Sequence, residues 1–310
     1  MIEIINPGLQ SIVVDNGRYG FADIGVPASS ALDGFAYKAV NLLTGHLNSP
    51  PVIESIGPMF SLVFHSNMTF AITGAWVDGT IDDRPLTSWQ SIKAKKGSIL
   101  KIKRVLKGFR YYLGFSGIMD LEKIMGSYTT NMECHFGGYG GRPLKKGDTI
   151  RFTFIKEISE KSMDSDTIPN MDPPHILRVV DGPEEGFFRE DCIGVFFRES
   201  YKVSPKSNRT GVTLAGPPVE FKEGVEKSII SEGVLPGTIQ IPGDGMPVIL
   251  LHERTVGGYA RLGVIARVDQ DLLAHLKPGD DVVFKRLSLG DAEQLWMQRQ
   301  KKIKNLSKFD

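Results

Sequence analysis

The segments LKKGDTIRFTF (144–154) and LKPGDDVVFKR (276–286) decide the fold, because each joins a tight basic turn to a strand of alternating polarity. A third segment, AKKGSILKIK (94–103), follows the same design of basic residue, glycine, small polar residue and strand. Alternation of apolar and polar residues with a period of two is typical of strands with one buried face. The two segments that share K-x-G-D lie far apart in the chain, and each is placed where a domain would close. We therefore predict two related β domains in tandem.

Short apolar runs bounded by glycine, proline or asparagine continue along the chain, as in SLVFHSNMTFAITG (61–74), and they predict a mainly β protein. Between the two K-x-G-D segments, KEISEKSMDSDTIPNMDPP (156–174) is polar and rich in proline, which is the composition of a linker. We place the boundary near Ile168. The expected domains are 1–167, with the linker starting at about 156, and 168–310.

Two helices interrupt the strand pattern. ALDGFAYKAVNLLTG (31–45) carries one apolar face, and we expect Ser30 to cap it, Asp33 to complete a capping box and Gly45 to end it. A second helix is expected at the C-terminal end over 292–306, capped by Asp291. The expected fold is thus two β domains with a few short helices and a C-terminal helix.

Composition excludes several classes of function. The 37 basic and 36 acidic residues leave a formal charge of +1, which supplies no field to gather nucleic acid or an anionic membrane. No apolar stretch approaches the ~20 residues that span a bilayer, and the start of the chain lacks the pattern of a signal peptide. Cys134 and Cys192 lie far apart and form no CxxC pair, which favours a reducing compartment. We expect a cytoplasmic protein.

Glycine and arginine concentrate in two loops of the first half. DNGRYGFADIGVPASSALDGFA (15–36) places Arg18 before a helix start, where free N–H groups can receive a carboxylate or phosphate. NMECHFGGYGGRPLKKGD (131–148) places four glycines around Tyr139, and successive amides in such a loop can form an anion-binding nest. Neither segment matches a Walker A loop or a dinucleotide-binding turn. Taken singly, each is also explained as an ordinary connection.

Two segments of the second half carry charged pairs next to strands. SPKSNRTGVTLAG (204–216) contains Asn208 and Arg209, and LLHERTVGGYARLG (250–263) contains Glu253 and Arg254 followed by a glycine pair. A charged pair that leaves a buried strand often faces a cleft, and its alternative is a surface ion pair. The histidines show no metal-ligand spacing and no GxSxG phrase is present, so we expect no metal and no serine nucleophile. The chemistry favoured is polar, with arginines and backbone amides stabilising charge and Asp33 or Glu253 as the base.

Taken in order, these segments resemble one family along nearly the whole chain: PGLQSIVVDNGRYGFADIGVPASSALDGFAYKAVNLLTG (7–45), HFGGYGGRPLKKGD (135–148), SNRTGVTLAGPP (207–218), GTIQIPGDGMPVILLHERTVGGYARLGVI (237–265) and LKPGD (276–280). They are similar to the KipA family, also called PxpC, which is a subunit type of 5-oxoprolinase, or allophanate hydrolase subunit 2. The family is related to the carboxyltransferase domain of urea carboxylase. The resemblance implies two tandem cyclophilin-like β barrels.

The resemblance also implies partners. Members act with a KipI-like protein, and in 5-oxoprolinase these two proteins use ATP to activate 5-oxoproline, while ring opening to glutamate is completed by a third subunit. We therefore expect an enzyme subunit that is inactive alone, with ATP shared with the partner. The chain lacks a Met-Lys-Met biotin-acceptor phrase, so it carries no covalent biotin of its own. Two alternatives remain open: a regulatory protein that antagonises a KipI-like kinase inhibitor, and a biotin-dependent carboxyltransferase component for urea or another small amide.

Site residues follow from the positions that match the family's motifs. Asn208 and Glu253 stand where the family usually has aspartate, so the first change removes a charge and the second lengthens the reach of the carboxylate. The residues expected to act in catalysis are Asp33, Glu253 and Arg254. Those expected to bind substrate are Arg18, Gly137, Gly138, Gly141, Arg142, Asn208, Arg209, Gly257, Gly258, Tyr259 and Arg261.

Overall fold

The computed structural model describes residues 1–306 and divides into two compact units. The first unit comprises Met1–Arg18 and Ser29–Met171, and the second comprises Tyr19–Ala28 together with the chain from Asp172 onward. A single division near Ile168 does not assign Tyr19–Ala28 to the second unit, because this short segment lies inside the first half of the sequence. The segment expected as a linker lies along the first unit, where the Lys161 carbonyl accepts a hydrogen bond from the Ser91 amide at 2.8 Å.

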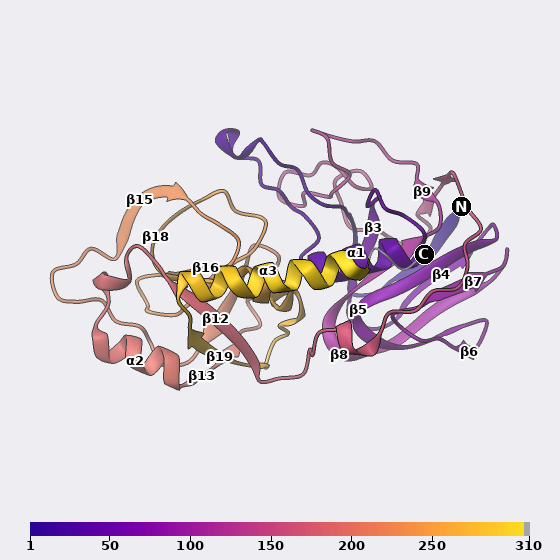
Figure 1. Ribbon diagram of the computed structural model, residues 1–310. Coiled ribbons are helices and arrows are strands. Elements are labelled where there is room, and N and C mark those ends of the chain that lie inside the picture. Colours follow the sequence, from indigo (N-terminus) through magenta and orange to yellow (C-terminus); the bar gives the residue numbers. More distant parts are fainter. Residues whose placement is uncertain (307–310) are drawn as a thin grey trace. The chain divides into compact units, whose positions relative to one another are not determined.

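The first unit is built on a curled antiparallel sheet in the order β10-β1-β4-β8-β3-β2, with β5, β6 and β7 attached through β8. Its longest strands, β5 and β8, pair along most of their length and run side by side in Figure 1. The strands are β1 (Ile2–Pro7), β2 (Gln10–Val14), β3 (Val52–Ile56), β4 (Phe60–Phe64), β5 (Met68–Ile81), β6 (Arg84–Pro85), β7 (Ser91–Ala94), β8 (Ile99–Phe115) and β10 (Thr149–Ile150). A separate pair joins β9 (Ile118–Met119) to β11 (Phe152–Thr153), and a short 3-10 helix, η2, spans Ser165–Thr167.

Helix α1 (Gly34–Leu43) packs on β5 and β8 of this sheet. The Thr73 hydroxyl of β5 donates to the Ala36 carbonyl at 2.7 Å, which ties the first turn of the helix to the sheet. The alternating residues of the strands meet in one apolar core that includes Phe60, Phe64 and Phe70, each with no exposed surface. The buried face of α1 and this core hold the helix start in a fixed place.

The second unit is a closed barrel in the order β12-β19-β13-β14-β17-β16-β18, because β12 also pairs with β18, and β15 extends the sheet beyond β18. Its strands are β12 (His175–Asp181), β13 (Ser200–Val203), β14 (Gly211–Ala215), β15 (Ser228–Gly233), β16 (Thr238–Ile241), β17 (Val248–Leu250), β18 (Val256–Ile265) and β19 (Asp281–Arg286). Its helices are η1 (Ala22–Ile24), η3 (Glu185–Phe187), α2 (Glu190–Arg198), η4 (Arg267–His275) and α3 (Leu289–Leu306). The expected mainly β fold with two tandem barrel-type domains is confirmed.

The three basic turns that opened the sequence analysis share one backbone geometry. In Lys95–Ser98, Lys145–Asp148 and Lys277–Asp280, the last side chain accepts a hydrogen bond from the amide of the first lysine, at 3.1, 2.7 and 3.2 Å. The glycine between them has a φ of +90°, +86° or +91°, which a side chain rarely adopts. The repeated phrase therefore predicts the turn correctly in both units.

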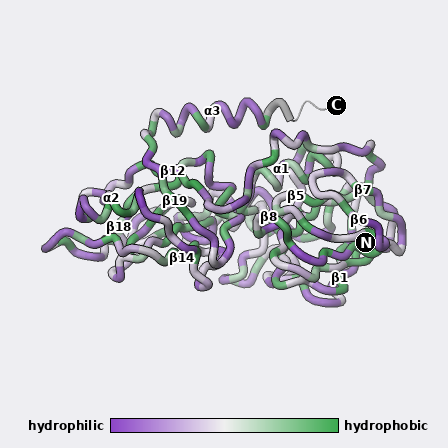
Figure 2. Tube along the Cα trace, turned by 90° about the horizontal axis from the view of Figure 1, so that it is seen from below, coloured by the Kyte–Doolittle hydropathy of each residue, from purple (hydrophilic) through white to green (hydrophobic). Residues whose placement is uncertain are grey.

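Helix α3 begins earlier than the sequence indicates. Ser288 precedes it, and the Asp291 amide donates to the Ser288 hydroxyl oxygen at 3.1 Å while that hydroxyl donates to the Asp291 carboxylate at 2.6 Å. The cap is therefore Ser288, and Asp291 is its capping-box partner. Figure 2 shows hydrophobic positions interrupting the mostly hydrophilic α3. Among residues 1–306, no helix is long and apolar enough to cross a membrane.

Candidate functional site

Asp33 caps helix α1. Its backbone is extended, with φ −100° and ψ 97°, and one carboxylate oxygen accepts the Ala36 amide at 2.8 Å. The helix therefore starts at Gly34 with Asp33 as the N-cap, and the prediction that Ser30 caps it is wrong, because only a residue directly before the first turn can reach the free amides. Its role as a base stays a prediction. The carboxylate lies at the positive end of the helix and is only 1% exposed, so its ionised form is favoured there.

A buried polar cluster behind Asp33 escaped the sequence analysis. The Tyr112 hydroxyl accepts the Asp33 amide at 2.9 Å and donates to the Glu54 carboxylate at 2.9 Å, and this carboxylate also accepts the Leu32 amide. The Arg110 guanidinium lies 3.5 Å from Glu54, with both side chains almost fully buried. Burial raises the pKa of Tyr112 well above its usual value, and the nearby Glu54 and Asp33 carboxylates raise it further. The one signal was a glutamate inside the apolar strand VIESI (52–56).

Arg18 lies inside the first unit, only 1% exposed. Its guanidinium donates to the carbonyls of Ile124 and Thr129, both at 3.0 Å, and lies 4.6 Å from the centre of the Phe136 ring. These contacts join a segment near the N-terminus to a loop more than a hundred residues later. The arginine thus ties two loops together.

The glycine loop packs tightly on the same residues. A Cβ built on Gly137 would lie 2.2 Å from the Thr129 carbonyl oxygen and 3.0 Å from the Arg18 guanidinium. A Cβ on Gly138 would lie 1.9 Å from the Thr130 hydroxyl, and one on Gly141 would lie 2.1 Å from the backbone of a residue in its own loop. The fold brings Arg18 and Gly137 together as predicted from the motif, and contacts with neighbouring backbone already explain why glycine is needed here.

Arg142 belongs to the turn that follows this loop. Its guanidinium donates twice to the Asp148 carboxylate, at 2.7 and 2.8 Å, and lies 5.1 Å from the centre of the Tyr139 ring. The hydrogen bond from Arg142 lowers the pKa of Asp148, despite the opposing effect of burial. Arg142 therefore clamps the K-x-G-D turn of the first unit.

Two predicted residues of the second unit form a buried ion pair. The Arg209 guanidinium donates to the Glu253 carboxylate at 3.2 Å, and the two residues are 5% and 7% exposed. Asn208 forms the adjacent turn, because its side-chain oxygen accepts the amides of Thr210 at 2.7 Å and Gly211 at 3.2 Å. An aspartate would make the same turn, so its replacement by asparagine keeps the acceptor that the turn requires.

The glycine pair and Arg261 lie on β18. A Cβ on Gly257 would lie 2.3 Å from the Gln240 side chain, so this glycine permits close packing of strands, whereas Tyr259 is 46% exposed. The Arg261 guanidinium donates twice to the Glu184 carboxylate, at 2.7 and 2.6 Å, and once to Glu232 at 2.8 Å. Hydrogen bonds from Glu184, above all, raise the pKa of Arg261, and this arginine holds β15 to the barrel.

Arg254 differs from the other predicted arginines because it is exposed and lines a pocket of about 630 Å³. The pocket lies entirely within the second unit and includes residues of the Tyr19–Ala28 segment, which directly follows Arg18. Its lining residues are Tyr19, Ala22, Ala28, Val180, Val234–Pro236, His252, Arg254, Thr255, Val264–Arg267, Gln270, Leu289, Ala292, Glu293 and Trp296. This volume is in the range of small-molecule sites. We name it the Arg254 pocket and take it as the candidate site.

Sequence reasoning missed several residues of the Arg254 pocket. Arg267 and Gln270 lie on η4, and Trp296 lies on α3, outside every motif that the sequence analysis used. The Arg267 guanidinium lies 5.3 Å from the Trp296 ring centre and donates to Gln270 at 2.6 Å. No local pattern marks these residues, because the barrel and α3 bring them together only in three dimensions.

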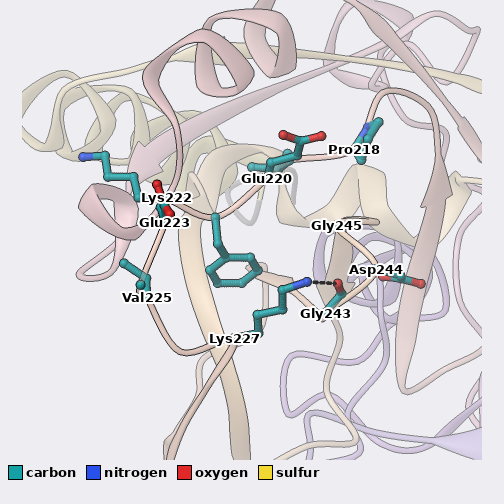
Figure 3. Close-up of a pocket in the computed structure, with 12 residues that line it drawn as sticks. Pro218, Glu220, Lys222, Glu223, Val225, Lys227, Gly243, Asp244 and Gly245 are labelled. Atoms are coloured by element: carbon teal, nitrogen blue, oxygen red, sulfur yellow. Dashed lines mark hydrogen bonds between the residues drawn. The ribbon is translucent and has the colours of Figure 1, made fainter.

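A second hollow of about 540 Å³ lies between the loops Pro218–Val225 and Gly243–Gly245. Figure 3 shows Lys227 reaching across it, where its amine donates to the Gly243 carbonyl at 3.2 Å. The charged side chains around it, Glu220, Lys222, Glu223 and Asp244, are exposed, so water competes for any ligand they would bind. Across residues 1–306, no group of three His, Cys, Asp or Glu side chains is arranged to hold a metal ion.

Comparison with known proteins shows the family. A model described as carboxyltransferase domain, subdomain A and B, matches residues 24–286. The chain belongs to this family. It is 31% identical to the PxpC-type subunit of 5-oxoprolinase from Escherichia coli, over 99% of this chain and 98% of that protein. These matches confirm the resemblance to the KipA family.

Larger enzymes contain a related region. The chain is 32% identical to urea amidolyase of Saccharomyces cerevisiae over 98% of its own length but spans only 18% of that protein. The crystal structure of K. lactis urea amidolyase matches with a TM-score of 0.92 at 29% identity, over 98% of this chain and 20% of that one. The same carboxyltransferase-type fold thus occurs as nearly the whole of one relative and as a fifth of a larger enzyme in another.

Proposed function

We propose that this carboxyltransferase-family chain is one subunit of a multi-protein, ATP-dependent 5-oxoprolinase and acts with a KipI-like partner protein. The observation that carries the proposal is its similarity to the PxpC-type 5-oxoprolinase subunit over nearly the full length of both chains. In the proposed reaction the lactam C–N bond breaks, water supplies the hydroxyl to the carbonyl carbon and a proton to the nitrogen, and ATP is hydrolysed to ADP and phosphate. The opening to glutamate is completed by a third subunit.

The Arg254 pocket is the proposed place for the small amide. Arg254 is an exposed guanidinium at its rim, and a guanidinium pairs well with a carboxylate. The other predicted arginines already have protein partners: Arg18 donates to two carbonyls, Arg209 to Glu253 and Arg142 to Asp148. We propose that ATP is shared with the partner protein, since the glycine loop around Gly138 packs against its own chain and offers no phosphate loop of a known type.

The decisive experiment reconstitutes the chain with the KipI-like protein and the ring-opening protein and measures ATP hydrolysis that depends on 5-oxoproline. We expect turnover only with all three proteins present, and Arg254→Ala to lower it about 10–100-fold, the usual effect of losing one charge-assisted contact. Arg104→Ala is the matched control, because Arg104 is an exposed arginine on β8 paired with Asp78. Absence of turnover with all three proteins, or full turnover by this chain alone, would overturn the proposal.

A carboxyltransferase acting on urea or a similar amide is the second candidate, favoured by the match to urea amidolyase with a TM-score of 0.92. It requires a biotinylated carrier protein, and it predicts carboxylation of urea when such a carrier is added. The regulatory alternative needs only a protein interface. It predicts that Arg254→Ala leaves binding to a KipI-like protein unchanged, whereas the enzyme proposal predicts a loss of turnover.

A further inference from the structure

The Arg254 pocket is much larger than the small amide that the proposed function places in it. A lactam carboxylate of about nine non-hydrogen atoms displaces roughly five water volumes, on the order of 150 Å³ at ~30 Å³ per water. The pocket measures about 630 Å³. Pockets of this size usually enclose ligands of several times that atom count. The surplus volume therefore has to hold a further part of the ligand.

The surplus is lined by apolar side chains. Val180 and Ile265 come from barrel strands, Leu235 from the loop between β15 and β16, and Ala292 and Trp296 from the start of α3. Leu235 is 69% exposed, so binding a hydrophobic group would remove apolar surface from water. The lining thus favours a ligand with a hydrophobic body.

Charge at the rim favours an anion. Arg254 and Arg267 are both exposed and line the pocket, and Glu293 is the one carboxylate among the described lining residues. Because the Arg267 guanidinium also lies over Trp296, the charged and apolar parts of the site are adjacent. A carboxylate between the two arginines would leave the hydrophobic body directed at Trp296.

The walls are held in place before any ligand binds. The Gln270 amide donates to the carbonyls of Pro236 at 3.0 Å and Ile265 at 3.1 Å, which links the loop after β15 to the end of β18. The Arg299 guanidinium of α3 donates to the Val268 carbonyl and, at 2.5 Å, to the Asp271 carboxylate of η4. A pre-formed cavity of this kind avoids the entropic cost of ordering its walls.

We propose that the Arg254 pocket binds an amide that carries both a hydrophobic group and a carboxylate, of the class represented by 5-oxoprolyl-leucine. The inference rests on the proposed function in placing the amide in this pocket. The leucine side chain fills the surplus against Trp296 and Ile265, and the terminal carboxylate pairs with Arg254 and Arg267. Free 5-oxoproline occupies only part of the same pocket.

Binding to the purified full-length chain tests the proposal without turnover. Calorimetric titration with 5-oxoprolyl-leucine, 5-oxoproline and urea is expected to give the tightest binding for 5-oxoprolyl-leucine, roughly 10–100-fold tighter than for 5-oxoproline, from burial of one leucine side chain. Tryptophan fluorescence is expected to change on binding. This change should disappear in Trp296→Phe and remain in Trp76→Phe, a control on β5 of the first unit.

A second variant separates the surplus volume from the amide position. Ala292→Leu on α3 extends a side chain into the pocket and is expected to weaken 5-oxoprolyl-leucine at least tenfold while leaving 5-oxoproline unchanged, with thermal unfolding as the check on folding. Equal affinities for the two lactams, or equal losses in Ala292→Leu, would overturn the inference. Failure of the reconstituted enzyme to hydrolyse ATP with 5-oxoproline would instead count against the proposed function, since the affinity ranking is measured on the chain alone.

Discussion

The arginines of the interior and the arginines of the Arg254 pocket occupy motifs that look alike in the sequence but do different things. Arg18 and Arg209 are 1% and 5% exposed and donate to groups of their own unit, whereas Arg254 is exposed at the pocket rim. Both kinds sit in turns next to glycine and polar residues. The difference teaches that an arginine in such a motif can be the fastening of a loop, and that only its exposure distinguishes a group that can meet a ligand.

Removing an interior arginine should have the largest effect on stability. Arg209→Ala leaves the Glu253 carboxylate buried without this guanidinium, and the expected loss is about 3–5 kcal/mol of unfolding free energy. Urea denaturation measures it. Arg104→Ala, which breaks an exposed pair, is expected to cost about 0–1 kcal/mol. Similar losses for the two variants would remove the distinction between interior and exposed arginines.

The glycine loop beside Arg18 offers a smaller and sharper test. Gly138 and Gly140 both have positive φ, at 55° and 66°, but only a Cβ on Gly138 meets another atom, the Thr130 hydroxyl. Both alanine variants incur the left-handed backbone cost, and Gly138→Ala is expected to lose about 1–3 kcal/mol more because of the clash. Chemical denaturation of the two variants gives the difference. Equal stabilities would show that the loop relaxes, and the tight packing around Arg18 would then be no constraint.

Acidity should reveal one buried histidine in each unit, with the smallest effect. Burial lowers the pKa of His175 despite its hydrogen bond with Asp280, and burial likewise lowers the pKa of His46. The unfolded chain then takes up protons more readily than the folded one, so stability falls as pH drops through about 6.5. Thermal unfolding from pH 7.5 to 5.5 is expected to show a falling midpoint.

Two variants assign this dependence to its source. His46→Gln and His175→Gln should each flatten it, His46→Gln for the first unit and His175→Gln for the second. Carboxylates whose pKa values are lowered by arginine hydrogen bonds, such as Asp148 and Glu184, lose their contribution only below about pH 4.5, outside this window. A midpoint that stays constant or rises on acidification would contradict the prediction.

Local patterns predicted much of the fold. The three K-x-G turns, the mainly β architecture and helix α1 follow from spacing that depends on near neighbours. The cap of α1 was misplaced because Ser30 and Asp33 are both good capping residues, and tertiary packing decides between them. The Tyr112 hydroxyl at Asp33 comes from 79 residues away, and the Glu253 partner of Arg209 from 44. Such pairings leave no trace in local spacing.

The candidate site was predicted in part for the same reason. Arg254 stands out in its motif, but the Trp296 and Arg267 that surround the same pocket lie in unremarkable helical sequence. The sequence could name a family and one residue of a wall. The volume and apolar lining that distinguish one amide from another come only from the assembled unit.

The Tyr19–Ala28 segment also orders events in time, because it belongs to the second unit although it lies inside the first half of the sequence. A ribosome that adds 5–20 residues per second needs roughly 10–30 s to pass from Ala28 to Asp172. During that interval the strands of the first unit can already pair, while this segment waits for a barrel not yet made. The Arg254 pocket, which this segment helps to line, is therefore among the last features of the chain to form.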